Sequence, residues 1–106
     1  MKIIWSDFAS QMIEDIYKYY KKRVSITLAK KIKSDIFFTT KQLIRHPESG
    51  QVEPTLKQLN QDHRYLIEGN YKIIYKKVNQ DILITDVFDT RQDPEMINVT
   101  TRKFDR

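Results

Sequence analysis

A chain of 106 residues with 40% hydrophobic residues, two glycines and three prolines is expected to fold as one domain without a long linker. The absence of cysteine excludes disulfides, thiolate metal sites and thiol nucleophiles, and no segment approaches the roughly 18 apolar residues of a membrane-spanning helix. The formal net charge of +5 lies entirely in residues 1–60, which hold eleven Lys or Arg against six Asp or Glu, and it favours polyanionic or acidic partners.

The chain opens with a short β-rich run, Lys2 to Trp5, which lacks the apolar core of a signal peptide, so we expect a cytoplasmic protein that does not bind membranes. Ser6 can then cap a helix, and Asp7 suits the positive end of its dipole. The apolar residues that follow recur every three to four positions, as on one face of an amphipathic helix that ends near Lys22 or Arg23. These residues are Phe8, Met12, Ile13, Ile16, Tyr17 and Tyr20.

Ser25 can cap a second helix, which the segment RHPESG (residues 45–50) ends, because proline disfavours helix in the residue before it and glycine permits a turn. Two helices joined by two or three residues must lie antiparallel. The buried stripe of this second helix is expected at Ala29, Ile32, Ile36, Leu43 and Ile44.

The end of the first predicted helix allows two interpretations. Lys18, Lys21, Lys22 and Arg23 either offset the helix dipole or bind an acidic or nucleic-acid partner. The nearby tyrosines could stack on bases, but their spacing favours packing between helices. They are Tyr17, Tyr19 and Tyr20.

The second half changes its period. Residues 52–62 show no clean repeat and are expected to form an irregular connection. Residues 63–68, 71–78 and 81–89 read as three strands, with turns at Gly69-Asn70 and Asn79-Gln80, where positive φ is tolerated. The predicted fold is therefore α+β: an N-terminal strand and an antiparallel helical hairpin packed on an antiparallel sheet whose last three strands form a meander. A single domain over 1–106 has a core of about residues 2–97 and a polar tail over 98–106.

Motifs for metabolic enzyme chemistry are missing. The two lone histidines, His46 and His63, have neither cysteines nor a paired carboxylate cluster for a metal site, and there is no phosphate-binding glycine loop. No cofactor and no metal are expected. The core should contain Trp5, Phe8, Ile13, Ile16, Ile32, Ile36, Ile73 and Tyr75.

Three segments carry a family resemblance: IIWSDFASQMIEDIYKYY at residues 3–20, LIRHPESGQVEPTLKQL at 43–59 and HRYLIEGNYKIIYKKVNQDILITDVFDTRQDP at 63–94. In this order they resemble the RelE/ParE superfamily of toxins from type II toxin–antitoxin systems, with the likeness extending over roughly residues 3–97. The resemblance implies the fold already predicted and a plasmid-stabilisation-like toxin that a cognate antitoxin neutralises. It also implies that operator DNA is reached only through the antitoxin.

The superfamily uses two mechanisms. RelE-like members cut messenger RNA on the ribosome, and the resemblance implies that a protein of this type would use His63, Lys72 and Arg91 as catalytic residues, together with Tyr65, with Arg91 on the functional face of the sheet. Such cleavage needs a base, cations and an acid around one phosphate. Ile97, however, stands where the family has a tyrosine or histidine, and Lys72 replaces an arginine and its bidentate grip.

ParE-like members instead inhibit DNA gyrase by binding, and the RQDP segment and the long helical hairpin favour this branch. Residues 61–106 are also charge-neutral, with eight basic against eight acidic residues, whereas ribosomal RNA favours a basic face. A third hypothesis is an inactive member of the fold that serves only as a binding module. The expected target- or partner-binding residues are Arg64, Lys72, Arg91, Lys18, Lys21 and Lys22.

Two arginines keep a structural alternative. Arg91 presents charge to the target or pairs with Asp89 or Asp93 to hold the loop that leaves the last strand. Arg64 either positions a carboxylate such as Glu53 or contacts a partner.

Overall fold

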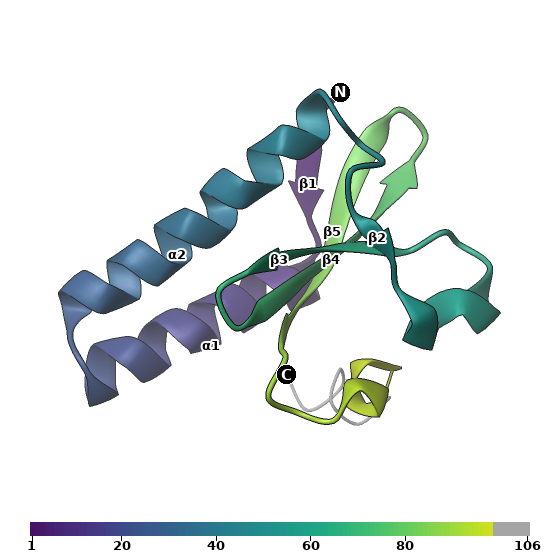
Figure 1. The fold of residues 1–106 in the computed structure, drawn as a ribbon. Coiled ribbons are helices and arrows are strands. Elements are labelled where there is room, and N and C mark those ends of the chain that lie inside the picture. Colours follow the sequence, from purple (N-terminus) through teal and green to yellow (C-terminus); the bar gives the residue numbers. More distant parts are fainter. Residues whose placement is uncertain (99–106) are drawn as a thin grey trace.

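The computed structural model describes residues 1–98, so that residues 99–106 of the expected polar tail lie outside the described residues, while Asn98 ends a short helix. A five-stranded sheet in the order β1-β5-β4-β3-β2 carries two long helices on one face (Figure 1). Residues 1–98 also contain three short 3-10 helices, η1 to η3. The strands are β1 (Ile3–Trp5), β2 (Gln51–Val52), β3 (Arg64–Glu68), β4 (Tyr71–Val78) and β5 (Asp81–Asp89).

Both predicted helix caps are present. Ser6 Oγ accepts the Ala9 N–H at 3.0 Å to begin α1 (Asp7–Arg23), and Ser25 Oγ accepts the Leu28 N–H at 3.1 Å to begin α2 (Ile26–Thr40). Only two residues join the helices, so they form the expected antiparallel hairpin (Figure 1).

The end of the second helix differs from the prediction. The α-helix stops at Thr40 and continues as η1 (Lys41–Ile44), in which Leu43 is buried but Ile44 is exposed. The expectation of a buried Ile44 was wrong, because the tighter 3-10 turn rotates each side chain further than an α-helix does.

The sheet contains the predicted meander and one parallel pair. Gly69 and Asn79 both have φ of +57° in the turns of β3-β4-β5, as predicted. The first strand, β1, lies parallel to β5, with Ile3 opposite Ile82, so the sheet is mixed rather than wholly antiparallel. The pairing of the first strand with the last puts β5 in the sheet interior.

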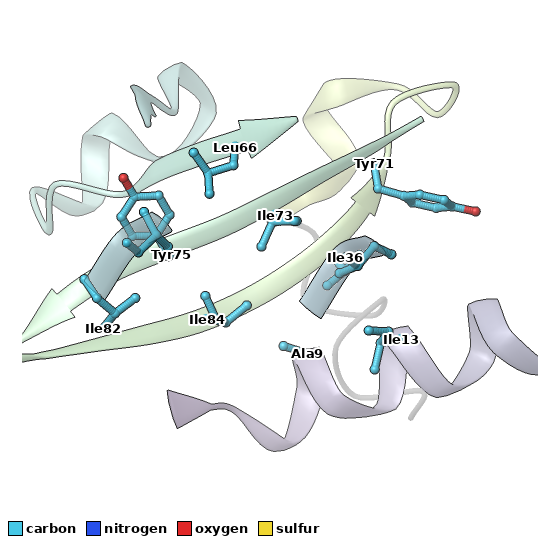
Figure 2. Packing of buried hydrophobic residues seen from close by; sticks show 11 residues of the cluster. Ala9, Ile13, Ile36, Leu66, Tyr71, Ile73, Tyr75, Ile82 and Ile84 are labelled. Atoms are coloured by element: carbon cyan, nitrogen blue, oxygen red, sulfur yellow. The ribbon is translucent and has the colours of Figure 1, made fainter. Parts of the chain in front are cut away.

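The main core lies between the sheet and the helical hairpin (Figure 2). Ile13, Ile36, Ile73 and Tyr75 are buried there as predicted, while Trp5, Ile16 and Ile32 are partly buried and pack against the core, and Phe8 is half-buried. Figure 2 shows Ile73 of β4 and Ile84 of β5 facing Ala9 and Ile13 of α1. Alternation along β4 therefore identified the correct inner residues.

A second, smaller core covers the opposite face of the sheet. Ile74 and Phe88 pack there against Leu56 of η2 (Pro54–Leu59) and Ile97 of η3 (Pro94–Asn98). The connection expected to be irregular thus contains β2 and η2, and Ile74 is fully buried although its neighbours in the alternation are lysines. Within residues 1–98, no helix is long and apolar enough to cross a membrane.

Candidate functional site

A cavity of about 290 Å³ opens between α1 and the end of β5, on the helix-covered side of the sheet. Its floor is apolar and its rim is charged. The residues that line it are Met12, Asp15, Ile16 and Tyr19 from α1 and Tyr71, Val87, Asp89, Arg91 and Gln92 from the sheet side.

Arg91 is held at the rim of this cavity by two parallel bonds. Its Nε donates to Asp89 Oδ1 at 2.9 Å and its Nη2 to Oδ2 at 2.7 Å, while the Arg91 backbone N–H also donates to Oδ1. The bonds from Arg91 lower the pKa of Asp89, and the same pairing raises the pKa of Arg91. The Arg91 side chain is 58% exposed, so the guanidinium is oriented by Asp89 and still open to a partner. Asp93, the other candidate partner, accepts the Glu95 N–H instead.

Tyrosines connect the cavity to the helices. The Tyr71 hydroxyl donates to the Tyr20 hydroxyl at 3.3 Å, and burial raises the pKa of Tyr71. Tyr19 meets the edge of Tyr20 at 5.2 Å and the Arg23 guanidinium lies 5.1 Å from its centroid. Tyr20 contacts the sheet and Tyr17 lies beside Lys33 of α2, as their spacing predicted, whereas Tyr19 is 52% exposed and its ring contacts lie within α1.

A separate polar cluster occupies the other face of the sheet. Lys72 Nζ lies 2.7 Å from Glu53 Oε1, and Glu53 Oε2 accepts the Thr55 N–H at 3.0 Å and its hydroxyl at 2.6 Å. The Glu53 side chain is 0% exposed and that of Lys72 is 18% exposed. Burial alone would raise the pKa of Glu53, but the bonds from Lys72 and Thr55 outweigh it, so the pKa is lowered. Lys72 also lies 4.3 Å from the centroid of the Tyr65 ring.

Arg64 pairs with a carboxylate of the connection, as one of its two predicted alternatives had it, but this carboxylate belongs to Asp62 and not to Glu53. Arg64 Nη1 donates to the Gly50 carbonyl at 3.0 Å, and its Nε lies 3.6 Å from Asp62. The register explains the difference: Arg64 pairs with Tyr75 and so shares the helix-covered face, whereas Glu53 reaches Lys72 on the other face.

His63 is buried immediately before β3, where its backbone carbonyl accepts the Glu53 N–H at 2.8 Å. Ile97 is buried against Ile74 and Phe88. The position at which the family resemblance calls for a proton-transferring side chain is therefore filled by an apolar one that packs in the second core.

Two of the three expected catalytic residues, Lys72 and Arg91, lie on opposite faces of the sheet. In the sheet register Lys72 lies opposite Phe88, on the face of the second core. Tyr71 lies opposite Asp89, on the helix-covered face, where Arg91 also lies. The cause is a register shift in β4-β5 between Ile74 and Tyr75. If side chains alternated strictly along β5 from Ile84, Asp89 would lie on the same face as Lys72. At the register shift β5 contains one extra residue, so the side chains beyond it point to the opposite face of the sheet.

Three exposed cations lie at the end of α1, apart from the cavity beside Arg91 and from the Lys72–Glu53 cluster: Lys18, Lys21 and Lys22. In the part of the chain that the structure describes, no group of three His, Asp or Glu side chains is arranged to hold a metal ion. Sequence reasoning missed Asp15, Tyr71 and Val87 as cavity residues, because only tertiary packing brings α1 against the end of β5.

Comparisons with known proteins agree with this architecture. Residues 3–94 match the sequence profile described as ParE toxin of type II toxin-antitoxin system, parDE. A search of curated proteins gives no match. A solved structure described as the chromosomal ParDE TA system from P. aeruginosa contains a chain that superimposes with a TM-score of 0.70 at 20% identity. The superposition covers 84% of this chain and 95% of that chain, and at this identity it shows a shared fold.

Proposed function

The chain belongs to the ParE toxin family and is the toxin component of a type II toxin–antitoxin system, and from this premise we propose that it inhibits DNA gyrase by binding, without a chemical step. A cognate antitoxin neutralises it. Arg91 and the adjoining cavity form the surface that engages the target.

One observation carries the choice of binding over RNA cleavage. The cation that a ribonuclease would need at Lys72 is bound to the fully buried Glu53, and Arg91 lies on the opposite face of the sheet. Cleavage by a ribose 2′-hydroxyl requires a base, cations and an acid around one phosphate. Groups separated by the thickness of the sheet cannot meet that requirement.

The Arg91–Asp89 pair suits recognition. A guanidinium held in a fixed plane loses little rotational freedom when it meets a carboxylate, and its charge-assisted bonds are strong. The cavity beside it offers an apolar floor at Met12, Ile16 and Val87 for an anchoring side chain of the target.

The antitoxin contributes an acidic, amphipathic segment that docks on the helical hairpin. The exposed Lys18, Lys21 and Lys22 support this assignment, since none of them is paired with a carboxylate within residues 1–98. Reversing the charge of all three weakens association and flattens its salt dependence, measured by calorimetry at two salt concentrations. Unchanged affinity would remove the electrostatic part of the proposal.

Gyrase supercoiling assays with purified protein test the proposed target. We expect inhibition by the wild-type protein, loss of inhibition in Arg91→Ala, and full inhibition by the matched surface variant Arg45→Ala, which also removes one exposed arginine. Stalled ribosomes incubated with the protein should show no messenger cuts in the A site. Ribosome-dependent cuts that disappear in His63→Ala would instead identify a ribonuclease.

A further inference from the structure

The connected ends of α1 and α2 project beyond the sheet, at the lower left of Figure 1. We name residues 18–30 the hairpin tip. Residues 21–27, at its end, are all exposed. Residues 16–34, which contain the tip, hold seven Lys or Arg and no Asp or Glu. Most of the positive charge excess of the protein thus lies in the hairpin tip and the adjoining turns of α1 and α2.

Most of these cations are not neutralised. Lys31 bonds to Asp35 at 2.7 Å and Lys33 bonds to Glu14 at 3.1 Å. The other five are exposed, and none forms an ion pair with a carboxylate of residues 1–98. We name these five the tip cations: Lys18, Lys21, Lys22, Arg23 and Lys30.

The first turn of α2 adds to the positive electrostatic potential of the tip cations. It contains no acidic residue, unlike the first turn of α1 with Asp7, so the positive end of its dipole lies beside the tip cations without a nearby compensating charge. The dipole contribution is smaller than that of the five whole charges and has the same sign.

The shape of the tip limits what it can bind. Residues 21–27 are all exposed, and none of them lines the cavity beside Arg91 or three other cavities of residues 1–98, so a partner would meet the end of the tip through its exposed side chains. The exposed large apolar residues of the tip are Tyr19, Val24 and Ile26, with 52%, 62% and 45% exposure, and the Tyr19 ring packs against Tyr20 and Arg23. The two remaining aliphatic side chains, Val24 and Ile26, are too few to insert stably into a membrane.

We propose that the hairpin tip binds the phosphate backbone of duplex DNA without reading its sequence. Flexible lysine side chains act as point charges for phosphates, and four of the five tip cations are lysines. Residues 16–34 contain no Asn or Gln, the side chains that form bidentate contacts with adenine, and Arg23 is the one side chain there with a planar fork of donors. A cluster of exposed lysines with few base-reading groups is typical of non-specific binding driven by counterion release.

This activity is separate from inhibition of gyrase, since it needs neither gyrase nor Arg91. It would hold the free toxin on DNA, where its proposed target works. An acidic antitoxin segment that binds the same lysines would displace the toxin from DNA.

The test is fluorescence anisotropy of the full-length protein with a labelled duplex of arbitrary sequence, titrated between about 50 and about 200 mM salt. Each phosphate contact contributes a slope of about −0.9 in the logarithmic plot, so five contacts give at most about −4.5, or a loss of about 500-fold in affinity over this range. Removing three tip cations in K21Q/K22Q/R23Q should reduce the slope to about −1.8, a loss of about 12-fold.

The matched control is R45Q/K57Q/K77Q, which removes three exposed cations elsewhere and changes the net charge equally. This control should keep the wild-type slope, and both variants should keep the wild-type circular dichroism spectrum. Equal reductions in the two variants would overturn the proposal, because diffuse net charge would then explain the binding. Tip-dependent binding to vesicles of anionic lipid, or to polyglutamate of equal charge, in preference to DNA would also overturn it.

Discussion

Replacing Lys72 by methionine should destabilise the protein by about 3 kcal/mol. Breaking a buried ion pair by removing one partner costs roughly 3–5 kcal/mol, because the other charge stays buried without compensation. Here the Glu53 carboxylate is 0% exposed and would keep only the two bonds from Thr55. The lower end of the range applies, since Lys72 is 18% exposed and water can reach part of the vacated position.

A second substitution separates lost charge pairing from lost packing. In the double variant Lys72→Met/Glu53→Gln, the buried group is neutral and can still accept the Thr55 N–H, so about 2 kcal/mol of the loss should return. Urea unfolding at neutral pH, followed by fluorescence, measures both variants. Lys77→Met is the matched control, because Lys77 is an exposed lysine of the same strand, and it should change stability by less than about 0.5 kcal/mol.

The pair also predicts a pH dependence. The pKa of Glu53 is lowered below its ordinary value of 4.5, so the unfolded chain binds the proton more readily than the folded one. The stabilisation by the pair is therefore fully present above pH 4.5 and disappears as the pH falls through the lowered pKa of the folded state. Unfolding measured from pH 7 downward should show the difference between wild type and Lys72→Met shrinking over this interval.

The reasoning fails if Lys72→Met is as stable as the wild type. It also fails if the double variant Lys72→Met/Glu53→Gln is no more stable than Lys72→Met alone. A stable Lys72→Met variant that has lost toxicity would instead return Lys72 to the target-binding surface. Growth of bacteria expressing the variant, scored beside its unfolding curve, distinguishes these outcomes.

Three further predictions concern other elements. Arg91→Ala should abolish toxicity in a growth assay while changing the unfolding free energy by at most about 1 kcal/mol. Arg91→Lys should also be less toxic, because lysine keeps the charge but loses the planar fork of donors. A fully toxic Arg91→Ala would mean that Arg91 has only a structural role. Gly50→Ala should destabilise by roughly 1–3 kcal/mol in urea unfolding, since its Cβ would lie 2.6 Å from the Tyr75 hydroxyl and 2.7 Å from the Tyr65 carbonyl; unchanged stability would mean that the loop shifts freely. Ser25→Ala should cost about 1 kcal/mol through the lost cap of α2, and no change in thermal unfolding would contradict the assigned cap.

The sequence by itself determined the elements whose signals are local. Ser6 and Ser25 begin helices because their hydroxyl groups bond to N–H groups three residues ahead, and Gly69 and Asn79 form turns because they tolerate positive φ. The alternation along residues 71–75 identified the side of β4 that faces the helices. The family resemblance followed from the order of these same pieces.

Tertiary structure decided which polar side chains meet. Glu53, named from the sequence as one alternative partner of Arg64, forms its ion pair with Lys72, because the arrangement of η2 against the sheet depends on contacts between segments far apart in the chain. Ile74 is buried for the same reason, since η2 and η3 cover a face that alternation alone would leave to solvent. The register shift in β4-β5 moves Arg91 to the face opposite Lys72. A bulge has no reliable signal within a few residues, since its position follows from the sum of pairing and packing contacts along both strands.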